Sequence, residues 1–192
     1  MTIRNVLLAL ALTTFTLAGC TQNTTFGISA NVLAFVEETD ETGNLPVSDA
    51  TVDVLGADGI ALSNFGISEN QAAGIETFTL DVDVDLTAAQ NNDADVTISA
   101  FIYLAESGTT LTDGQITTDS VTLAAGADGT LTLAAEIDST DTSNLEILQS
   151  GNAVIGIRLA IASGGAATNS VDYTLQTVDL GGSYTPSDAL TF

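Results

Sequence analysis

Apolar and polar residues alternate along most of the chain, a pattern typical of strands with one buried face rather than of helices. The clearest segment is 76–86, ETFTLDVDVDL, in which every second residue from Phe78 to Leu86 is apolar. The residues between them are Thr or Asp, and Thr suits strands because its β-branched side chain fits the pleat. We therefore expect a strand here with a buried face and a solvated, acidic face.

The same alternation predicts eight further strands, at 26–36, 50–55, 59–67, 95–105, 115–123, 129–137, 153–162 and 171–180. Segments 95–105 and 153–162 are apolar on both faces, so we expect them at the centre of a sheet. The segments 37–49 and 87–94 are polar and predict exposed loops.

One segment, 141–151, departs from the strand pattern. Asp141 or Ser143 can cap a short helix near 143–150 that carries Leu145 and Leu148, and Gly151 can end it. The tetrapeptide GADG occurs at 56–59 and 126–129, each time between two strand-like segments. Asp-Gly favours tight turns, so both copies predict a reversal of the chain.

These elements predict an all-β fold, an antiparallel β-sandwich formed by a single domain over 26–192. The turns are too close in sequence for helical crossovers, and a closed β-barrel is the alternative. Short strands and Greek-key-compatible loops make the architecture similar to immunoglobulin-like sandwiches, although the chain has no tryptophan and no cysteine pair. The expected core comprises Phe78, Leu80, Val82, Val84, Ile98, Ile102, Leu131, Leu133, Ile155, Ile157 and Leu159.

The first twenty residues, MTIRNVLLALALTTFTLAGC, have the features of a secretory signal peptide. Arg4 supplies a positive charge, and the apolar stretch from Val6 to Leu17 is shorter than the ~20 residues that span a bilayer. Leu17-Ala18-Gly19-Cys20 resembles the lipobox of bacterial lipoprotein precursors, and Cys20 is the only cysteine.

This resemblance implies that residues 1–19 are removed, that Cys20 is lipidated (a diacylglycerol on its thiol, an acyl chain such as palmitate on its amino group), and that 20–25 form a tether. Two or more acyl chains anchor a protein stably. The expected location is the cell envelope. Thr21, rather than Asp, follows the cysteine. By the same resemblance, Thr21 favours the outer membrane in a cell with two membranes, and the outer leaflet of the cell membrane otherwise.

The composition excludes much chemistry. The chain has 25 acidic residues, two basic residues and no histidine, for a formal net charge of −23. Without histidine, the usual catalytic triads and most zinc, copper and haem sites are excluded. Arg4 and Arg158 are the only cations, so neither a phosphate-binding patch nor nucleic-acid binding is expected.

Carboxylates are the remaining candidates for chemistry. Asp81, Asp83 and Asp85 line one face of the 76–86 strand, but alternate strand residues lie ~6.5–7 Å apart and cannot all ligate one ion. Asp93 and Asp95, from the following turn, could complete a Ca²⁺ site, because Ca²⁺ takes 6–8 oxygen ligands. The competing interpretation is a solvated acidic face that discourages aggregation between sheets.

Three further groups of charged residues each predict a structural or chemical role. Glu37, Glu38, Asp40 and Glu41 predict a solvated loop, and Glu106 with Glu136 is a candidate acid and base pair for a glycan hydrolase. Arg158 interrupts an apolar strand, so we expect a structural ion pair with one of the carboxylates.

We therefore expect a lipid-anchored envelope protein with a structural, adhesive or binding role, an envelope protein or surface polymer as partner, and no enzymatic activity or cofactor. The alternatives are a Ca²⁺-dependent adhesion or surface-layer component and, from a different class, a carboxylate-based glycan hydrolase.

Overall fold

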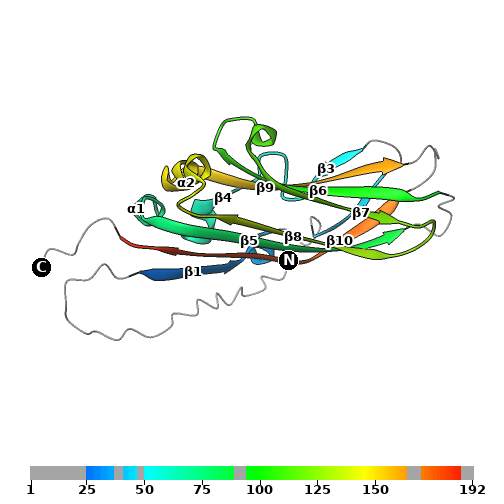
Figure 1. The fold of residues 1–192 in the computed structure, drawn as a ribbon, viewed down its shortest axis with the longest axis horizontal. Helices are drawn as coiled ribbons and strands as arrows, with labels where there is room; N and C mark the ends of the chain where they lie inside the picture. The colour runs from blue at the N-terminus through cyan, green and yellow to red at the C-terminus, as the bar shows by residue number, and fades with distance from the viewer. Residues whose placement is uncertain (1–24, 37–40, 47–49, 89–93, 164–169, 187–192) are drawn as a thin grey trace, which may run out of the picture.

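The structure is a computed structural model that describes residues 25–36, 41–46, 50–88, 94–163 and 170–186. These residues form two antiparallel five-stranded sheets that pack face to face (Figure 1). Cys20 and the predicted signal peptide, residues 1–19, lie outside the described residues. None of the helices in the described ranges has the length and apolar character needed to cross a membrane.

The first sheet, called sheet A below, has the order β1 (Phe26–Asn31), β10 (Val171–Tyr184), β5 (Ile75–Ala88) and β8 (Gly129–Ile137). The short strand β2 (Thr42–Leu45) also pairs with β10, further along the same edge as β1. The strand β5 covers the segment in which the alternation is clearest, and it lies between β10 and β8 with partners on both sides.

The second sheet, sheet B, has the order β3 (Thr51–Asp53), β9 (Ala153–Ser163), β6 (Val96–Glu106) and β7 (Gln115–Leu123), and β4 (Ile60–Ala61) adds to β9 beside β3. The two strands that are apolar on both faces, β6 and β9, occupy the middle of this sheet, which confirms the expectation from the sequence.

The strand order is that of a jelly roll. If β1 with β2 and β3 with β4 are each counted as one broken strand, eight strands form two sheets in which the first and last pair as β1 and β10. Among the described strands, β6 and β7 are the only consecutive ones that pair. The predicted β-sandwich is therefore confirmed and the barrel is not adopted, but the order differs from that of immunoglobulin domains.

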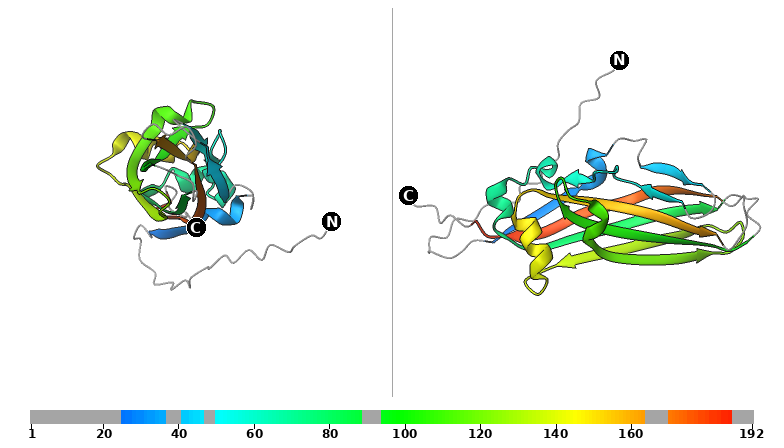
Figure 2. Two further views of the ribbon diagram at one scale, coloured as in Figure 1. Left: turned by 90° about the vertical axis from the view of Figure 1, so that its right-hand side faces the viewer. Right: turned by 90° about the horizontal axis from the view of Figure 1, so that it is seen from above.

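The two ends of the sandwich differ (Figure 2). One end, called the helical end, carries α1 (Glu69–Ala72), η3 (Leu111–Gly114) and α2 (Thr142–Gln149) in its connections. The other, called the loop end, carries the connections that follow β2, β5, β7 and β9. Strand β1 begins and β10 ends at the helical end, where Oγ1 of Thr25 lies 3.1 Å from Oγ1 of Thr185.

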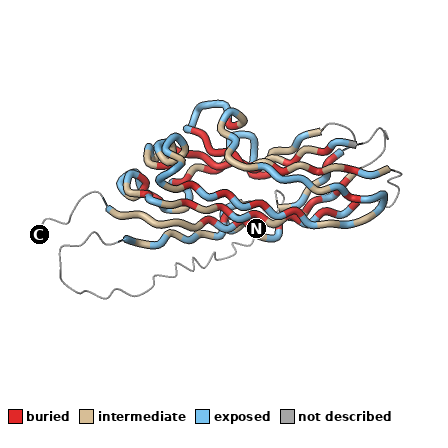
Figure 3. The backbone as a smooth tube through the Cα atoms, viewed as in Figure 1, coloured by how far each residue is buried: buried red, intermediate tan, exposed pale blue. Residues whose placement is uncertain are grey.

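The core lies between the sheets, as the buried stretches in Figure 3 show. Every residue of the predicted core is buried, with exposed fractions between 0% and 2%: Phe78, Leu80, Val82, Val84, Ile98, Ile102, Leu131, Leu133, Ile155, Ile157 and Leu159. The alternation therefore identified the inner faces of β5, β6, β8 and β9 correctly.

Several local expectations need correction. The segment 26–36 is a strand only to Asn31, because the Asn31 side chain accepts a hydrogen bond from the Leu33 N–H and starts the 3₁₀ helix η1 (Val32–Phe35). The segment 59–67 forms only β4 before η2 (Leu62–Phe65). Strand β2 lies where a loop was expected, and α1 was not predicted.

Helix α2 confirms the expected helix. It spans Thr142–Gln149, and the Asp141 side chain accepts a hydrogen bond from the Asn144 N–H at its N-terminus. Helix α1 begins with a capping box, in which Ser68 and Gln71 satisfy each other's backbone N–H groups. Both helices cover the same end of the sandwich.

Candidate functional site

The outer face of sheet A carries an acidic face, and this is the most chemically distinctive surface of the described chain. Alternation directs the residues that face away from the core to one side of β5, β8 and β10. The carboxylates of this acidic face are Asp81, Asp83, Asp85, Glu136, Asp172 and Asp179.

Asp83 is at the centre of the acidic face and is held by two hydroxyl groups. The Thr132 hydroxyl of β8 donates to Oδ1 at 2.7 Å, and the Thr177 hydroxyl of β10 donates to Oδ2 at 2.9 Å. Asp85 accepts a longer bond, 3.3 Å, from the Thr130 hydroxyl. The threonines of the neighbouring strands therefore act as hydrogen-bond donors to these carboxylates, which removes much of the need for a cation.

Asp81 has a different neighbour. The register of β5 and β10 places it directly opposite Asp179, and both side chains are exposed. Side chains in directly opposite positions have Cβ atoms about 4.5–5.5 Å apart, so two like charges repel each other there. This pair is not apparent in the sequence, because it depends on the register of two strands that are far apart in the chain.

The five residues proposed to bind Ca²⁺ do not converge within the described part of the chain. Asp81, Asp83 and Asp85 share the outer face of β5, whereas the exposed Asp95 precedes β6 in sheet B. Asp93 lies outside the described residues. No group of three or more carboxylates suited to a metal ion occurs among the described residues. The Ca²⁺ site stays a prediction, with its loop residue untested.

Arg158 forms the structural ion pair expected from the sequence. Its Nε donates to Asp53 Oδ1 at 2.6 Å, and its Nη2 donates to Asp53 Oδ2 at 2.9 Å, which makes the pair bidentate. The hydrogen bonds from Asp53 raise the pKa of Arg158 above its usual value, against the effect of partial burial. The guanidinium carbon also lies 5.7 Å from the centre of the Tyr103 ring.

The aromatic residues on the outer face of sheet B do not form an open platform. The rings of Phe101 and Tyr103 stack with their centres 6.2 Å apart and their planes at 24° to each other. Tyr103 is only 5% exposed, because η3 folds back over this part of β6 and Leu111 packs in the same small cluster. Only Phe101 remains partly accessible.

Two open hollows lie at the helical end. One of about 340 Å³ is lined by Leu104, Glu106, Asp113 and Ile147, among others, between η3 and α2. The other, of about 470 Å³, lies between the start of β5 and α2 and contains Glu76 and Asp138.

Asp138 is unsuited to act as a proton donor near neutral pH. The Thr140 hydroxyl donates to its Oδ1 at 2.6 Å and the Thr140 N–H donates to the same oxygen at 2.8 Å. These bonds stabilise the charged form and lower the pKa of Asp138 below its usual value. The carboxylate therefore remains ionised and is unsuited to donate a proton in the second hollow.

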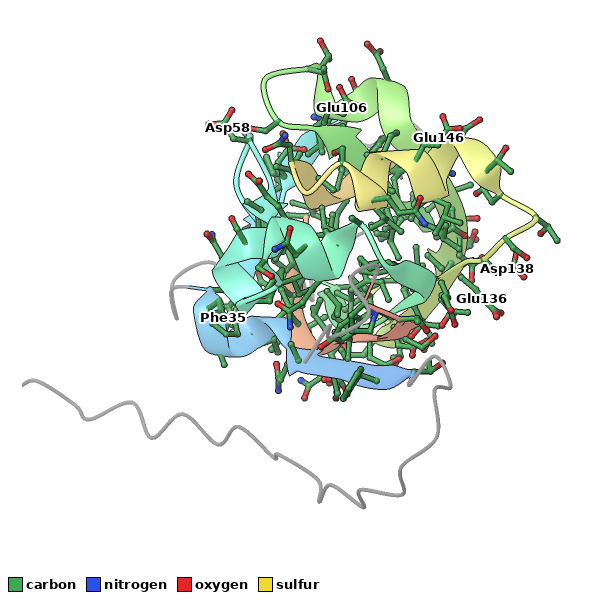
Figure 4. All side chains as sticks on the ribbon, turned by 90° about the vertical axis from the view of Figure 1, so that its left-hand side faces the viewer. Phe35, Asp58, Glu106, Glu136, Asp138 and Glu146 are labelled. Atoms are coloured by element: carbon green, nitrogen blue, oxygen red, sulfur yellow. The ribbon has the colours of Figure 1, made fainter. Side chains whose placement is uncertain are left out.

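The candidate acid and base, Glu106 and Glu136, do not face a shared cleft. Glu106 ends β6 in sheet B, and Glu136 lies near the end of β8 in sheet A. Figure 4 shows both on different sides of the sandwich when it is viewed from the helical end. This arrangement does not support a glycosidase mechanism, which needs two carboxyl groups across one bond.

The acidic loop 37–41 is described only at its last residue. Glu41 is half-buried, and its carbonyl accepts a hydrogen bond from the Leu175 N–H at 2.8 Å. Glu37, Glu38 and Asp40 lie outside the described residues.

No protein-family model matches the chain, and no curated protein matches it in sequence. Among solved structures, the VP2 protein of infectious bursal disease virus is similar in arrangement, with a TM-score of 0.44 and 13% identity over 93% of this chain. The chain spans only 36% of that protein's length.

Two smaller structures are also similar. Desmodium yellow mottle tymovirus has a TM-score of 0.33 and 10% identity, covering 100% of this chain and 98% of the other. The xylan-binding module CBM15 has a TM-score of 0.30 and 13% identity, covering 84% and 97%. Similarities of this extent assign no function to the chain.

Proposed function

We propose that the chain is a lipid-anchored protein of the cell envelope, in which the jelly-roll domain has a structural, adhesive or binding role and not an enzymatic one. The observation that carries this proposal is the segment Leu17-Ala18-Gly19-Cys20 after an apolar stretch that is too short to cross a bilayer. The location follows from the same segment: the outer membrane of a cell with two membranes, or the outer leaflet of the membrane otherwise.

The structure adds support through the place where the domain starts. The described fold begins at Thr25, five positions after Cys20, and an extended chain of that length reaches about 17 Å. A lipid on Cys20 would hold the helical end close to the bilayer and leave the loop end pointing away from it. The loop end is then the part of the molecule that extends farthest from the bilayer.

The site chemistry supports a role without catalysis. The chain has no histidine, and the candidate acid and base pair, Glu106 and Glu136, lies at or near the ends of two strands that belong to different sheets. A high negative charge keeps neighbouring molecules apart, which suits a protein that is crowded on a surface.

The anchor is tested by replacing its attachment atom. Cys20→Ser should abolish incorporation of labelled palmitate and shift the protein out of the membrane fraction or leave its precursor unprocessed. Thr21→Ala, which keeps the lipobox, is the matched control and should be processed like the unaltered chain. An unmodified Cys20, found by intact-mass analysis of protein extracted from membranes, would rule the proposal out.

The orientation is tested separately. A fluorophore is placed at either of two exposed positions, by Ser143→Cys in α2 or Ala125→Cys in the turn after β7. In vesicles that carry a quencher on the lipid headgroup, the label in α2 should be quenched more strongly. Equal quenching at both positions would contradict the proposed orientation but not the anchor.

A further inference from the structure

Sheet A ends at β8, and this edge differs from the other sheet edges of the described chain. Strand β8 runs without interruption for 9 residues, GTLTLAAEI, and contains no proline. Among the described strands it pairs only with β5. An edge strand presents unpaired backbone groups that can bind a further strand.

The register shows which residues of sheet A direct their backbone groups toward which neighbour. The Leu175 N–H of β10 donates to the Glu41 carbonyl, on the side of β2. Successive residues of an antiparallel strand direct their backbone N–H and C=O groups to opposite neighbouring strands, so those of Thr174 point to β5. The backbone groups of its partner Asp85 point to β10 in return, and those of the adjacent Val84 therefore point to β8.

The same alternation continues into β8. Val84 is opposite Leu131, so the Leu131 backbone bonds to β5. The backbone groups of Thr130, Thr132 and Ala134 then point away from β5, to the free edge. These residues also carry exposed side chains, so nothing on their own strand covers the edge.

The other described edges each carry a feature that blocks pairing. On β7 the Asp119 carboxylate accepts a hydrogen bond, 2.7 Å, from the Ser120 N–H, which occupies an edge donor. The edge of β1 ends after 6 residues, where η1 turns away, and β2, β3 and β4 have only 4, 3 and 2 residues. Short and interrupted edges of this kind prevent strand addition. Strand β8 lacks these protections.

Charge decides what this edge can accept. A second copy of the chain would bring another formal net charge of −23 to it. The exposed Glu136 lies on β8, and Asp81, Asp83 and Asp85 lie on the next strand, so acidic groups already flank the edge. Asp119 lies on β7, the strand of sheet B adjacent to β8. A strand with lysine or arginine at alternate positions would lie beside Glu136 and one strand away from the three aspartates of β5, whereas an acidic strand would be repelled.

The geometry points to the free edge of β8 as an acceptor for an extended, basic segment of a partner protein, which adds a strand to sheet A. Backbone hydrogen bonds to Thr130, Thr132 and Ala134 provide the pairing, and the acidic face selects the sign of the partner's charge. This inference does not depend on the lipid anchor.

The test measures binding of a labelled peptide, Lys-Thr-Lys-Val-Lys-Thr-Lys, to the full chain by fluorescence anisotropy. Thr132→Pro removes an edge N–H, and proline is tolerated where that N–H faces solvent. We expect it to weaken binding at least tenfold. Thr132→Val is the matched control, because it loses the same hydroxyl bond to Asp83 but keeps the N–H, and it should bind like the unaltered chain.

A second measurement does not depend on how the variants fold. Two versions of this peptide carry N-methyl groups on alternate amides, one on the odd and one on the even positions. Both keep the charge, but only one of them loses the amide hydrogens that would bond to β8, so only that peptide should lose binding. Equal binding by both methylated peptides, or by a natively folded Thr132→Pro chain, would show attraction by charge alone and overturn the proposal. The proposal would also be overturned if the unaltered chain formed a dimer in the absence of peptide and Thr132→Pro abolished this dimer. The edge would then bind a second copy of the chain.

Discussion

Arg158 and Asp53 form the only ion pair found among the described residues, and both side chains are about a quarter exposed, at 25% and 24%. Water therefore screens part of their attraction, but the two hydrogen bonds of the bidentate arrangement should make this pair more stabilising than an ordinary surface ion pair. Removing Arg158 leaves Asp53 unpaired in a chain with 24 other acidic residues, so the loss of Arg158 should cost more than the loss of Asp53.

A double-mutant cycle tests this pair. Arg158→Gln and Asp53→Asn should each lower the free energy of unfolding measured in urea, with a coupling energy of about 1 kcal/mol. Arg158→Gln should be the more harmful of the two. Purely additive effects would mean that the pair contributes nothing beyond its packing.

Thr140 should control the ionisation of Asp138. Thr140→Val removes the hydroxyl bond that contributes most to lowering the pKa of Asp138, so an NMR titration should show that pKa rising toward its usual value. Thr140→Ser keeps the donor and is the control.

The sign of the pH dependence follows from the lowered pKa. The stabilisation from ionised Asp138 is fully present above the pKa of the unfolded chain and is lost as the pH falls through the lower pKa of the folded state. The difference in unfolding free energy between Thr140→Val and Thr140→Ser should therefore shrink as the solution becomes strongly acidic. A difference that stays constant with pH would assign the effect to packing.

The fold of η3 against β6 requires the small size of Gly114. A Cβ atom on this residue would overlap the carbonyl oxygen of Leu104, which is part of the β6 backbone and cannot turn aside. Gly114→Ala should therefore destabilise the protein by roughly 1–3 kcal/mol in thermal or urea unfolding. Gly27→Ala is the control, because nothing lies within 4 Å of its Cβ position, and a comparable loss there would refute the steric explanation.

Alternation predicted the elements that have one buried and one exposed face. The bounds of β7 and β8 match the sequence expectation at both ends, 115–123 and 129–137. Strand β2, TGNL, escaped prediction because it has one buried apolar residue, Leu45, and exists through its pairing with β10. The segment 62–65 has strand-like residues, but after β4 the chain forms the 3₁₀ helix η2 there. The local pattern therefore did not predict the element that this segment adopts.

Contacts between distant strands were the part that the sequence could not supply. The need of Arg158 for a carboxylate was predictable, but its identity as Asp53 depends on the register of β3 with β9. The jelly-roll order, the opposition of Asp81 to Asp179 and the hydroxyl bonds of Asp83 depend on register in the same way. No periodicity within a single strand records which strand will be its neighbour.

The charge of the whole molecule predicts its response to salt. With so few cations, most carboxylates repel one another, and added salt should raise the melting temperature as the screening length falls from ~10 Å at 0.1 M to ~3 Å at 1 M. Millimolar Ca²⁺ should raise the melting temperature further than NaCl of equal ionic strength only if the folded state binds Ca²⁺ at a specific site. An equal effect would refute the Ca²⁺ site at Asp81, Asp83, Asp85, Asp93 and Asp95, and a fall in melting temperature with salt would refute the repulsion.

The position of β1 at the edge of sheet A has a mechanical consequence. Its 6 residues pair with β10 in antiparallel register, and its first residue lies at the helical end, where the proposed anchor joins. A force between the anchor and a partner held at the loop end would pull β1 along β10 and load all the hydrogen bonds of that ladder together. A force between the N-terminus and the C-terminus would instead peel the same two strands apart one bond at a time. The domain should therefore resist tension from its far end far better than tension between its own termini.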